Sequence, residues 1–152
     1  MNIMNTKFIT LVCRYFLGII FIYASFTKII DPISFSSNID NYHITPIAIN
    51  NLVALIIPWI ELFIGLGLIF NKYIKGSIVI MIFLLILFII MISQAYFRGI
   101  DLHCGCFKSI QSSNIKDLKA DMLKKIAEDI VFLCMAIYLY FIYIIKPNNY
   151  DQ

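Results

Sequence analysis

The sequence IVIMIFLLILFIIMI, residues 78–92, decides the fold of this chain because it contains no polar side chain. A helix needs about 20 predominantly apolar residues to cross the hydrocarbon core of a bilayer. Continued outward, the apolar stretch covers residues 76–97 and ends at Arg98-Gly99. We therefore expect a transmembrane helix over residues 76–97.

Three further stretches have the length and composition of a membrane span, and they cover residues 8–30, 51–70 and 126–145. Core helices of a soluble protein are the alternative, but four runs of full spanning length argue against it. The first run is also longer than the roughly 7–15 apolar residues of a signal peptide, and no small-residue cleavage site follows it. The sequence therefore predicts an all-α, four-transmembrane-helix bundle, with residues 1–152 as a single integral membrane domain.

The composition indicates the same class of protein. Of the 152 residues, 61% are hydrophobic and 14% are charged, whereas a soluble domain usually has about 25% charged residues. The formal net charge of +3 is small and spread out, and no basic stripe interleaved with aromatic residues lies in a polar segment. The expected partner of most of the surface is therefore the lipid bilayer, and nucleic acid is not an expected partner.

Three connections join the expected spans. Residues 31–50 are polar and have room for a short helix, whereas residues 71–75 form a tight turn that makes spans two and three antiparallel neighbours. Residues 99–125 begin with a cysteine-bearing loop, about residues 99–113. The helix start signal Ser112-Ser113-Asn114 then opens an amphipathic lead into span four.

The orientation in the membrane follows from the cysteines, because Lys and Arg occur on both sides and give conflicting signals. Four spans place both termini on one side and the cysteine-bearing loop on the other. Disulfides persist outside the cytosol. We therefore expect the loop outside and both termini in the cytoplasm.

Polar and small residues recur along one face of each of the first two spans. Such residues in a membrane usually face the interior of the bundle. Spacings of three and four residues place each set on one helical face. We expect these faces to pack together, with Arg14, Gly18, Phe21, Ser25 and Lys28 in span one and Ala54, Pro58, Glu61 and Gly65 in span two.

Depth along the helix axis predicts how the charges pair. At a rise of about 1.5 Å per residue, Arg14 and Glu61 lie at similar depths, so we expect an ion pair between them. Near the opposite side, Lys28, Arg98 and Asp129 reach a common level. One interpretation is that these charges fix helix packing. The other is a polar cavity that holds a quinone or a partner's thiols through Trp59, Gln94, Tyr96 and Arg98.

The stretch Asp101-Leu102-His103-Cys104-Gly105-Cys106-Phe107 brings cysteine, histidine, carboxylate and glycine together outside the apolar runs. Alpha carbons at the spacing of Cys104 and Cys106 lie about 5.5–7 Å apart, near the upper edge of disulfide range. A bond between them is strained and therefore labile. Gly105 permits the backbone dihedrals of such a ring, and a protonated His103 favours the Cys104 thiolate. These features indicate a redox pair.

Other interpretations of this loop stay open. A metal ion would need Asp101, His103, Cys104 and Cys106 as neighbouring ligands, and the sequence has no second cluster of Cys or His. Two surface thiols without a role are another alternative.

The aromatic and cysteine residues inside the spans have structural explanations. Cys13 and Cys134 differ in depth by about 10 Å, too far for a disulfide, so we expect both to be small buried apolar side chains. Tyr138, Tyr140 and Tyr143 are expected to form an interfacial aromatic belt at the end of span four.

Together these residues resemble the methylamine-utilisation MauE family, within the wider DoxX-like group of small four-span membrane proteins. The resemblance covers nearly the whole chain, and its specific part is Cys104-Gly105-Cys106-Phe107 after the third span. Two positions depart from the family pattern: Lys108 replaces a glycine and Glu128 replaces an arginine. The remaining matches are Arg14, Gly18, Phe21, Lys28, Asp31-Pro32, Tyr42, Pro46, Pro58, Glu61, Gly65, Arg98-Gly99 and Asp129.

The resemblance implies a four-helix bundle with a redox-associated role. The family's named member is thought to help mature a disulfide-rich periplasmic subunit of methylamine dehydrogenase, and other relatives look like thiol–disulfide partners of thioredoxin-like proteins. Our first hypothesis is a membrane thiol–disulfide oxidoreductase in which Cys104 and Cys106 exchange with a thioredoxin-like or disulfide-containing extracytoplasmic protein. Electrons would then pass to or from a quinone or a second protein.

Two further hypotheses are kept. The chain would serve as a non-enzymatic membrane anchor of a redox complex, or as a small transporter that uses an Arg14–Glu61 pair. No broken-helix pair or internal repeat supports the transporter. In the first hypothesis, Arg14, Lys28, Glu61 and Asp129 are structural polar residues of the bundle.

Overall fold

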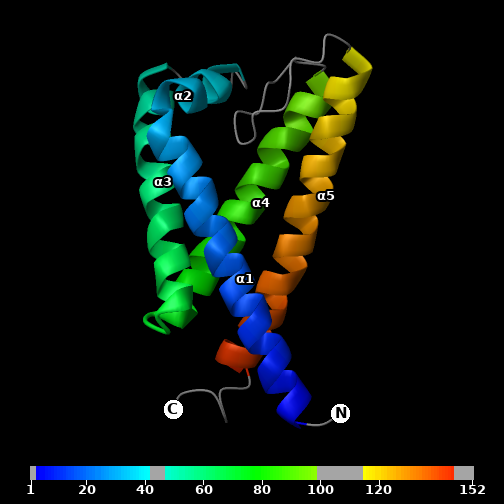
Figure 1. Ribbon diagram of the computed structural model, residues 1–152. Coiled ribbons are helices and arrows are strands. Elements are labelled where there is room, and N and C mark those ends of the chain that lie inside the picture. Colours follow the sequence, from blue (N-terminus) through cyan, green and yellow to red (C-terminus); the bar gives the residue numbers. More distant parts are fainter. Residues whose placement is uncertain (1–2, 42–46, 99–114, 146–152) are drawn as a thin grey trace.

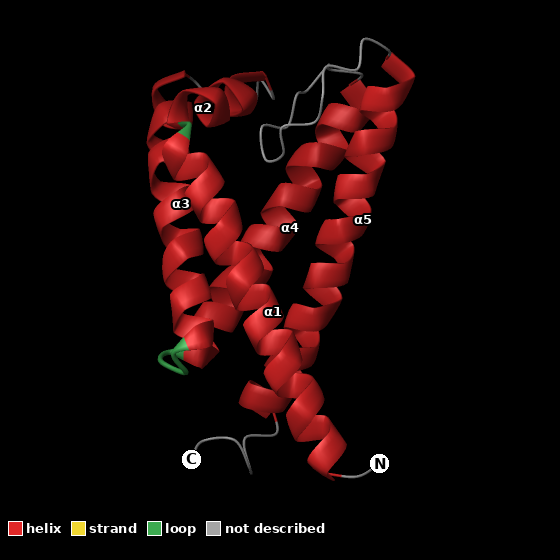
Figure 2. Ribbon diagram, in the orientation of Figure 1, coloured by secondary structure: helices red, strands yellow, loops and turns green. Residues whose placement is uncertain are grey.

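The computed structural model describes residues 3–41, 47–98 and 115–145, and these are helical apart from short turns (Figures 1 and 2). No strand occurs among them. In chain order they form α1 (Ile3–Ile30), α2 (Pro32–Asn41), α3 (Ile47–Ile69), α4 (Ile74–Arg98), α5 (Ile115–Tyr140) and the π-helical turn η1 (Phe141–Ile145).

Four of the helical stretches are long and apolar enough to cross a membrane, which confirms the all-α fold with four spans. They cover Lys7–Ile30, Leu52–Ile69, Ile74–Gln94 and Ala120–Ile145. Large apolar side chains are exposed along all of them, among them Phe63 and Phe83. In a soluble protein such a surface would be an aggregation hazard, whereas in a bilayer it contacts lipid.

The connection after α1 contains the expected short helix, and its start is capped locally. Asp31 accepts hydrogen bonds from the Ser34 backbone N–H at 3.1 Å and from the Ser34 hydroxyl at 2.7 Å. Pro32 follows as the first residue of α2, a position where its missing N–H costs nothing. The chain therefore leaves α1 and enters α2 with only one residue between them.

The predicted helix start signal, Ser112-Ser113-Asn114, lies outside the described residues. The expected helical lead into span four is present. It is the first part of α5, which continues into the membrane span as one helix.

The turn between α3 and α4 is tight, as expected, and makes these helices antiparallel neighbours (Figure 1). Asn71 and Tyr73 adopt left-handed backbone conformations, with φ of 60° and 57°. Asparagine tolerates this region better than most residues, whereas an aromatic residue does so at a cost. Left-handed conformations at two of three successive residues let the chain reverse its direction within so short a connection.

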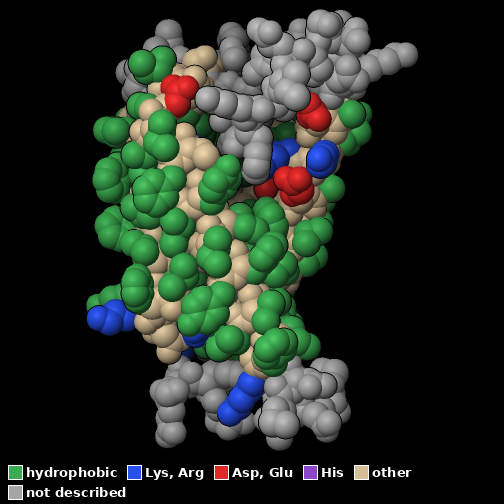
Figure 3. Space-filling view, in the orientation of Figure 1, with side chains coloured by type: hydrophobic (Ala, Val, Ile, Leu, Met, Phe, Trp, Pro, Cys, Tyr) green, Lys and Arg blue, Asp and Glu red, His purple; other side chains and the backbone are tan. Residues whose placement is uncertain are grey.

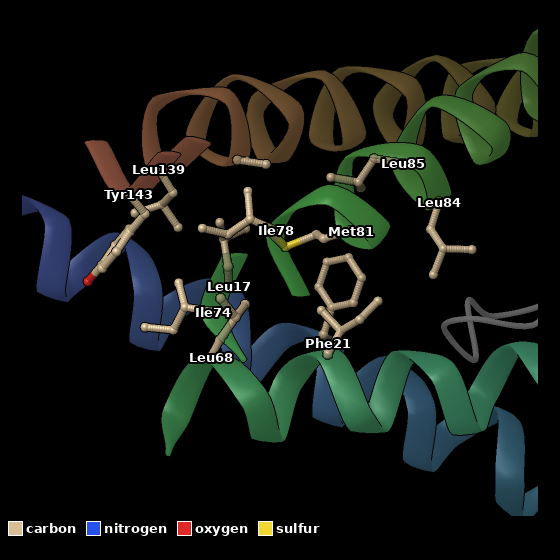
Figure 4. Close-up of a cluster of buried hydrophobic side chains, with 12 residues drawn as sticks. Leu17, Phe21, Leu68, Ile74, Ile78, Met81, Leu84, Leu85, Leu139 and Tyr143 are labelled. Carbon is tan, nitrogen blue, oxygen red and sulfur yellow. The ribbon is translucent and has the colours of Figure 1, made fainter. Parts of the chain in front are cut away.

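The helices pack as two pairs, α1 along α3 and α4 along α5. In Figure 1 the pairs cross near the end that carries both termini and diverge toward the other end. The core follows this shape. Near the termini one apolar cluster combines α1, α3, α4, α5 and η1, including Leu17, Leu68, Ile78 and Leu139 (Figure 4).

Toward the other end the buried apolar side chains separate into two clusters. One joins Ile92 of α4 to Met122 of α5. The other joins Phe35 and Ile39 of α2 to Ala54 and Ile57 of α3, with Phe88 of α4 packed against it. The half of the bundle away from the termini therefore lacks the common core of the other half.

Two glycines bring α1 and α3 into close contact. A Cβ added at Gly65 would lie 2.6 Å from Ile22 Cγ1 and 2.8 Å from the Gly18 carbonyl oxygen. A Cβ at Gly18 would lie 2.9 Å from Ile69 Cγ1. Membrane helices associate through such close packing, since lipid is as apolar as the helix surface. The crossing of α1 and α3 therefore requires glycine at both positions.

Substitution Gly65→Leu is expected to lower the free energy of unfolding by about 1–3 kcal/mol, because it overpacks this contact. Unfolding in mixed detergent micelles, followed by circular dichroism, measures the change. Gly76→Leu is the matched control, since a Cβ at Gly76 meets nothing within 4 Å. Equal stability of the two variants would contradict the close approach of α1 and α3.

Candidate functional site

The predicted redox residues lie outside the described part of the chain. These are His103, Cys104, Gly105, Cys106 and Phe107. Arg98 is the last residue of α4, and its side chain also lies outside the described set. What the structure does place is the polar interior of the bundle, which holds the other four predicted residues: Arg14, Lys28, Glu61 and Asp129.

A buried ion pair joins α1 to α3. Lys28 Nζ donates to Glu61 Oε1 at 2.5 Å. The two residues are only 5% and 2% exposed. At this depth water does not screen the charges, so their attraction is far stronger than that of a surface pair. Removing either partner would leave the other charge buried and uncompensated inside the bundle.

The expected Arg14–Glu61 pair is therefore wrong, and the register of the helices explains why. Gly18 lies against Gly65, and the Ser25 hydroxyl donates to the Pro58 carbonyl oxygen at 2.7 Å. In this register Glu61 lies about 12 Å along the axis from the level of Arg14 but about 9 Å from that of Lys28. Side chains on a helix point toward its N-terminus, so Lys28 extends toward Glu61.

The ammonium of Lys28 also contacts two aromatic rings. Nζ lies 4.8 Å from the ring centroid of Phe88 in α4 and 5.3 Å from that of Phe35 in α2. Both distances are within the range of cation–π attraction. Lys28 is thus the point at which α1, α2, α3 and α4 converge.

Asp129 is the buried carboxylate of α5, at 7% exposure. It shares a helical face with Met122 and Ile126, which pack against Ile92 of α4. Each pair of helices therefore buries a carboxylate, Glu61 in one and Asp129 in the other. On the face shown in Figure 3, the acidic side chains likewise gather in the half of the molecule away from the termini.

Arg14 has a different set of partners, at the end of the bundle that carries the termini. Its Nη1 donates to Asn71 Oδ1 in the α3–α4 turn and to the Tyr143 hydroxyl at 3.4 Å. The guanidinium carbon lies 5.1 Å from the ring centroid of Tyr15. Arg14 thereby links α1 to the turn and to η1.

Two expectations about side chains inside the spans are wrong, and so is one part of the alternative interpretation that a polar cavity lies there. Tyr143 is buried in the common core rather than in an interfacial belt. Cys134 is exposed rather than buried, while Cys13 is partly buried and both thiols are free. Trp59 is 49% exposed next to the buried Pro58, so it faces away from α1. It therefore does not line an interior cavity with Gln94 and Tyr96.

Helical spacing in the sequence predicts both the burial of Tyr143 and the outward position of Cys134. Asp129, Ala136, Leu139 and Tyr143 repeat at intervals of seven, three and four residues, and all are buried. Cys134 falls outside that stripe.

Among the described residues no group of three His, Cys, Asp or Glu is placed to hold a metal ion. The alternative metal ligands of the cysteine loop lie outside them.

Four helices long and apolar enough to span a membrane, two of which bury an ion pair between them, define a polytopic α-helical membrane protein with a polar interior. Residues 6–142 match the family model described as methylamine utilisation protein MauE. The match covers most of the chain, and the chain belongs to the MauE family. No match was found among curated proteins or among solved structures.

Removing one partner of the buried pair is expected to lower the free energy of unfolding much more than removing both partners. Lys28→Met leaves the Glu61 carboxylate buried without its ammonium, which lowers the free energy of unfolding by about 3–5 kcal/mol. The double variant, Lys28→Met with Glu61→Leu, is expected to lose less stability than the sum of the losses in the two single variants. Chemical denaturation of the four proteins in micelles gives the coupling energy.

The control is the pair Lys125–Glu128, which is 3.4 Å apart with side chains 25% and 41% exposed. Lys125→Met is expected to change stability by less than about 1 kcal/mol. Additive effects at Lys28 and Glu61 would show that the two charges do not stabilise each other.

Proposed function

We propose that this chain is a membrane thiol–disulfide protein, with Cys104 and Cys106 as its redox pair. Its partner is a thioredoxin-like or disulfide-containing protein outside the cytoplasm of a bacterium. In this proposal the protein lies in the inner membrane, with both termini in the cytoplasm. MauE family membership supports it, since the specific part of the sequence resemblance is the Cys-Gly-Cys-Phe stretch.

The observation that carries the proposal is the position of the helix ends that flank the cysteines. α4 ends at Arg98 and α5 begins at Ile115, and these helices pack along each other. Cys104 follows Arg98 by six residues, and six residues span at most about 20 Å. α4 itself is about 37 Å long. These lengths support the proposal that the cysteines act at the membrane face opposite the termini.

The proposed chemistry is two-step thiol–disulfide exchange. A partner thiolate attacks one sulfur of the Cys104–Cys106 disulfide, and a mixed disulfide forms as the other sulfur leaves as a thiolate. The second partner thiolate then attacks the mixed disulfide, so the partner is oxidised and the loop becomes a dithiol. The reverse sequence reduces the partner. Strain in the ring formed by two cysteines with one residue between them favours the first step.

Return to the starting state needs a second redox partner. Within the described residues the thiols Cys13 and Cys134 are both free, and Cys134 faces outward. The proposal assigns neither of them a role in electron transfer. A quinone or a second thiol protein would exchange two electrons and two protons with the pair.

Cysteine trapping tests the proposal. In intact cells, Cys104 and Cys106 are expected to resist alkylation until a reductant is added. Cys106→Ser is expected to leave Cys104 in a mixed disulfide with the partner, visible as a reductant-sensitive shift on a gel. Cys13→Ser with Cys134→Ser is the matched control and should change neither result. The proposal fails if both loop thiols are always alkylated freely and Cys106→Ser leaves the partner's oxidation unchanged.

A further inference from the structure

The surface around the α3–α4 turn lies at the depth of lipid headgroups. It consists of Asn71, Lys72, Tyr73, Lys75 and Gly76, all exposed. One membrane span ends at Ile69 and the next begins at Ile74, so the turn lies where the chain leaves the hydrocarbon. Tyr73 is 89% exposed, and exposed tyrosines are typical of the membrane–water interface. We call these residues the turn surface.

Charges of one sign gather at this end of the bundle. The described residues there that carry charge are Lys7, Arg14, Lys72 and Lys75, and the described stretches place no Asp or Glu among them. The opposite end mixes signs, with Lys124 and Lys125 near Asp121 and Glu128. The turn surface is therefore the cationic end of the described molecule.

Arg14 holds a positive charge directly beneath the turn surface. It is 8% exposed, and it donates to Asn71, the exposed residue that opens the turn. Among the described residues it has no carboxylate partner, and its buried Nε has no hydrogen-bond acceptor. An anion at the turn surface would complement this charge, because the low dielectric of the interior strengthens the attraction.

The first turn of α4 adds backbone donors at the same place. Tyr73 occupies the N-cap position, as its carbonyl oxygen accepts the Ser77 N–H at 2.9 Å. Tyrosine is not a residue type that caps helix N-termini, and the first turn of α4 has no acidic side chain. Beside it, a Cβ added at Gly76 would meet no other atom within 4 Å. Free amides and the helix dipole make such a terminus attractive to phosphate.

From these four observations we propose that the turn surface binds the phosphate of an anionic phospholipid. Depth selects a lipid rather than a dissolved anion, because the turn lies at headgroup level between two membrane spans. Lys72, Lys75 and the first amides of α4 contact the phosphate, and Arg14 attracts it from below. The inference is independent of the redox proposal, since no cysteine takes part in it.

Native mass spectrometry of the full chain in detergent tests the proposal, with palmitoyl-oleoyl phosphatidylglycerol as the probe and the matching phosphatidylcholine for comparison. The wild-type protein is expected to bind phosphatidylglycerol at least tenfold more tightly. Lys72→Gln with Lys75→Gln is expected to weaken that binding about tenfold or more, since each lysine near an anionic surface contributes about a fivefold factor. Lys124→Gln with Lys125→Gln removes the same charge from the opposite end and should leave the binding unchanged.

A second pair of variants separates binding from folding. Gly76→Glu adds a carboxylate to the first turn of α4, where there is room for it and where an acid stabilises a helix. It is expected to fold and to lose the preference for phosphatidylglycerol. Gly76→Gln has the same size without the charge and should keep that preference. Equal binding of both lipids by the wild-type protein overturns the proposal. An equal loss of phosphatidylglycerol binding in the two double-lysine variants also overturns it. So does displacement of the lipid by millimolar inorganic phosphate, which would indicate a site for a free anion.

Discussion

The ion pair between Lys28 and Glu61 is the interaction on which the arrangement of the helices depends. Its atoms are 2.5 Å apart in an interior from which water is excluded. A charge in a hydrocarbon environment is stabilised by a partner of this kind. Because Lys28 also contacts Phe35 and Phe88, one ammonium fixes the positions of four helices. A displacement of α1 or α3 along its axis would separate the two buried charges, and a displacement of α2 or α4 would move an aromatic ring away from the ammonium.

This constraint matters most in the half of the bundle away from the termini. Near the termini a common apolar core already holds all the spans together. Beyond Phe21 the apolar contacts separate into an α2–α3 cluster and an α4–α5 cluster. Lys28 and Glu61 lie where the two pairs of helices diverge, and Phe88 links them to α4. Apolar packing alone discriminates poorly between helix and lipid, so the polar contacts specify this half.

Composition and spacing were sufficient to predict the spans and their inward faces. Residues 78–92 have no alternative to a membrane span, and every residue of the two predicted polar faces is buried. The pairing of charges was not predictable, because it depends on the offset between helices, which the Gly18–Gly65 contact sets. The outward position of Cys134 and the burial of Tyr143 could have been predicted from spacing. The predicted cysteine pair lies outside the described residues.

The two proposals concern opposite ends of α4, and its length connects them. A helix of 25 residues is about 37 Å long, whereas the hydrocarbon core is about 30 Å thick. If phosphate contacts hold the first turn of α4 at headgroup level, its last residue, Arg98, emerges on the far side of the membrane. A cysteine pair that begins six residues later is then within reach of a soluble partner. The depth of the turn surface would thereby set the level at which α4 delivers the chain to the proposed cysteine pair.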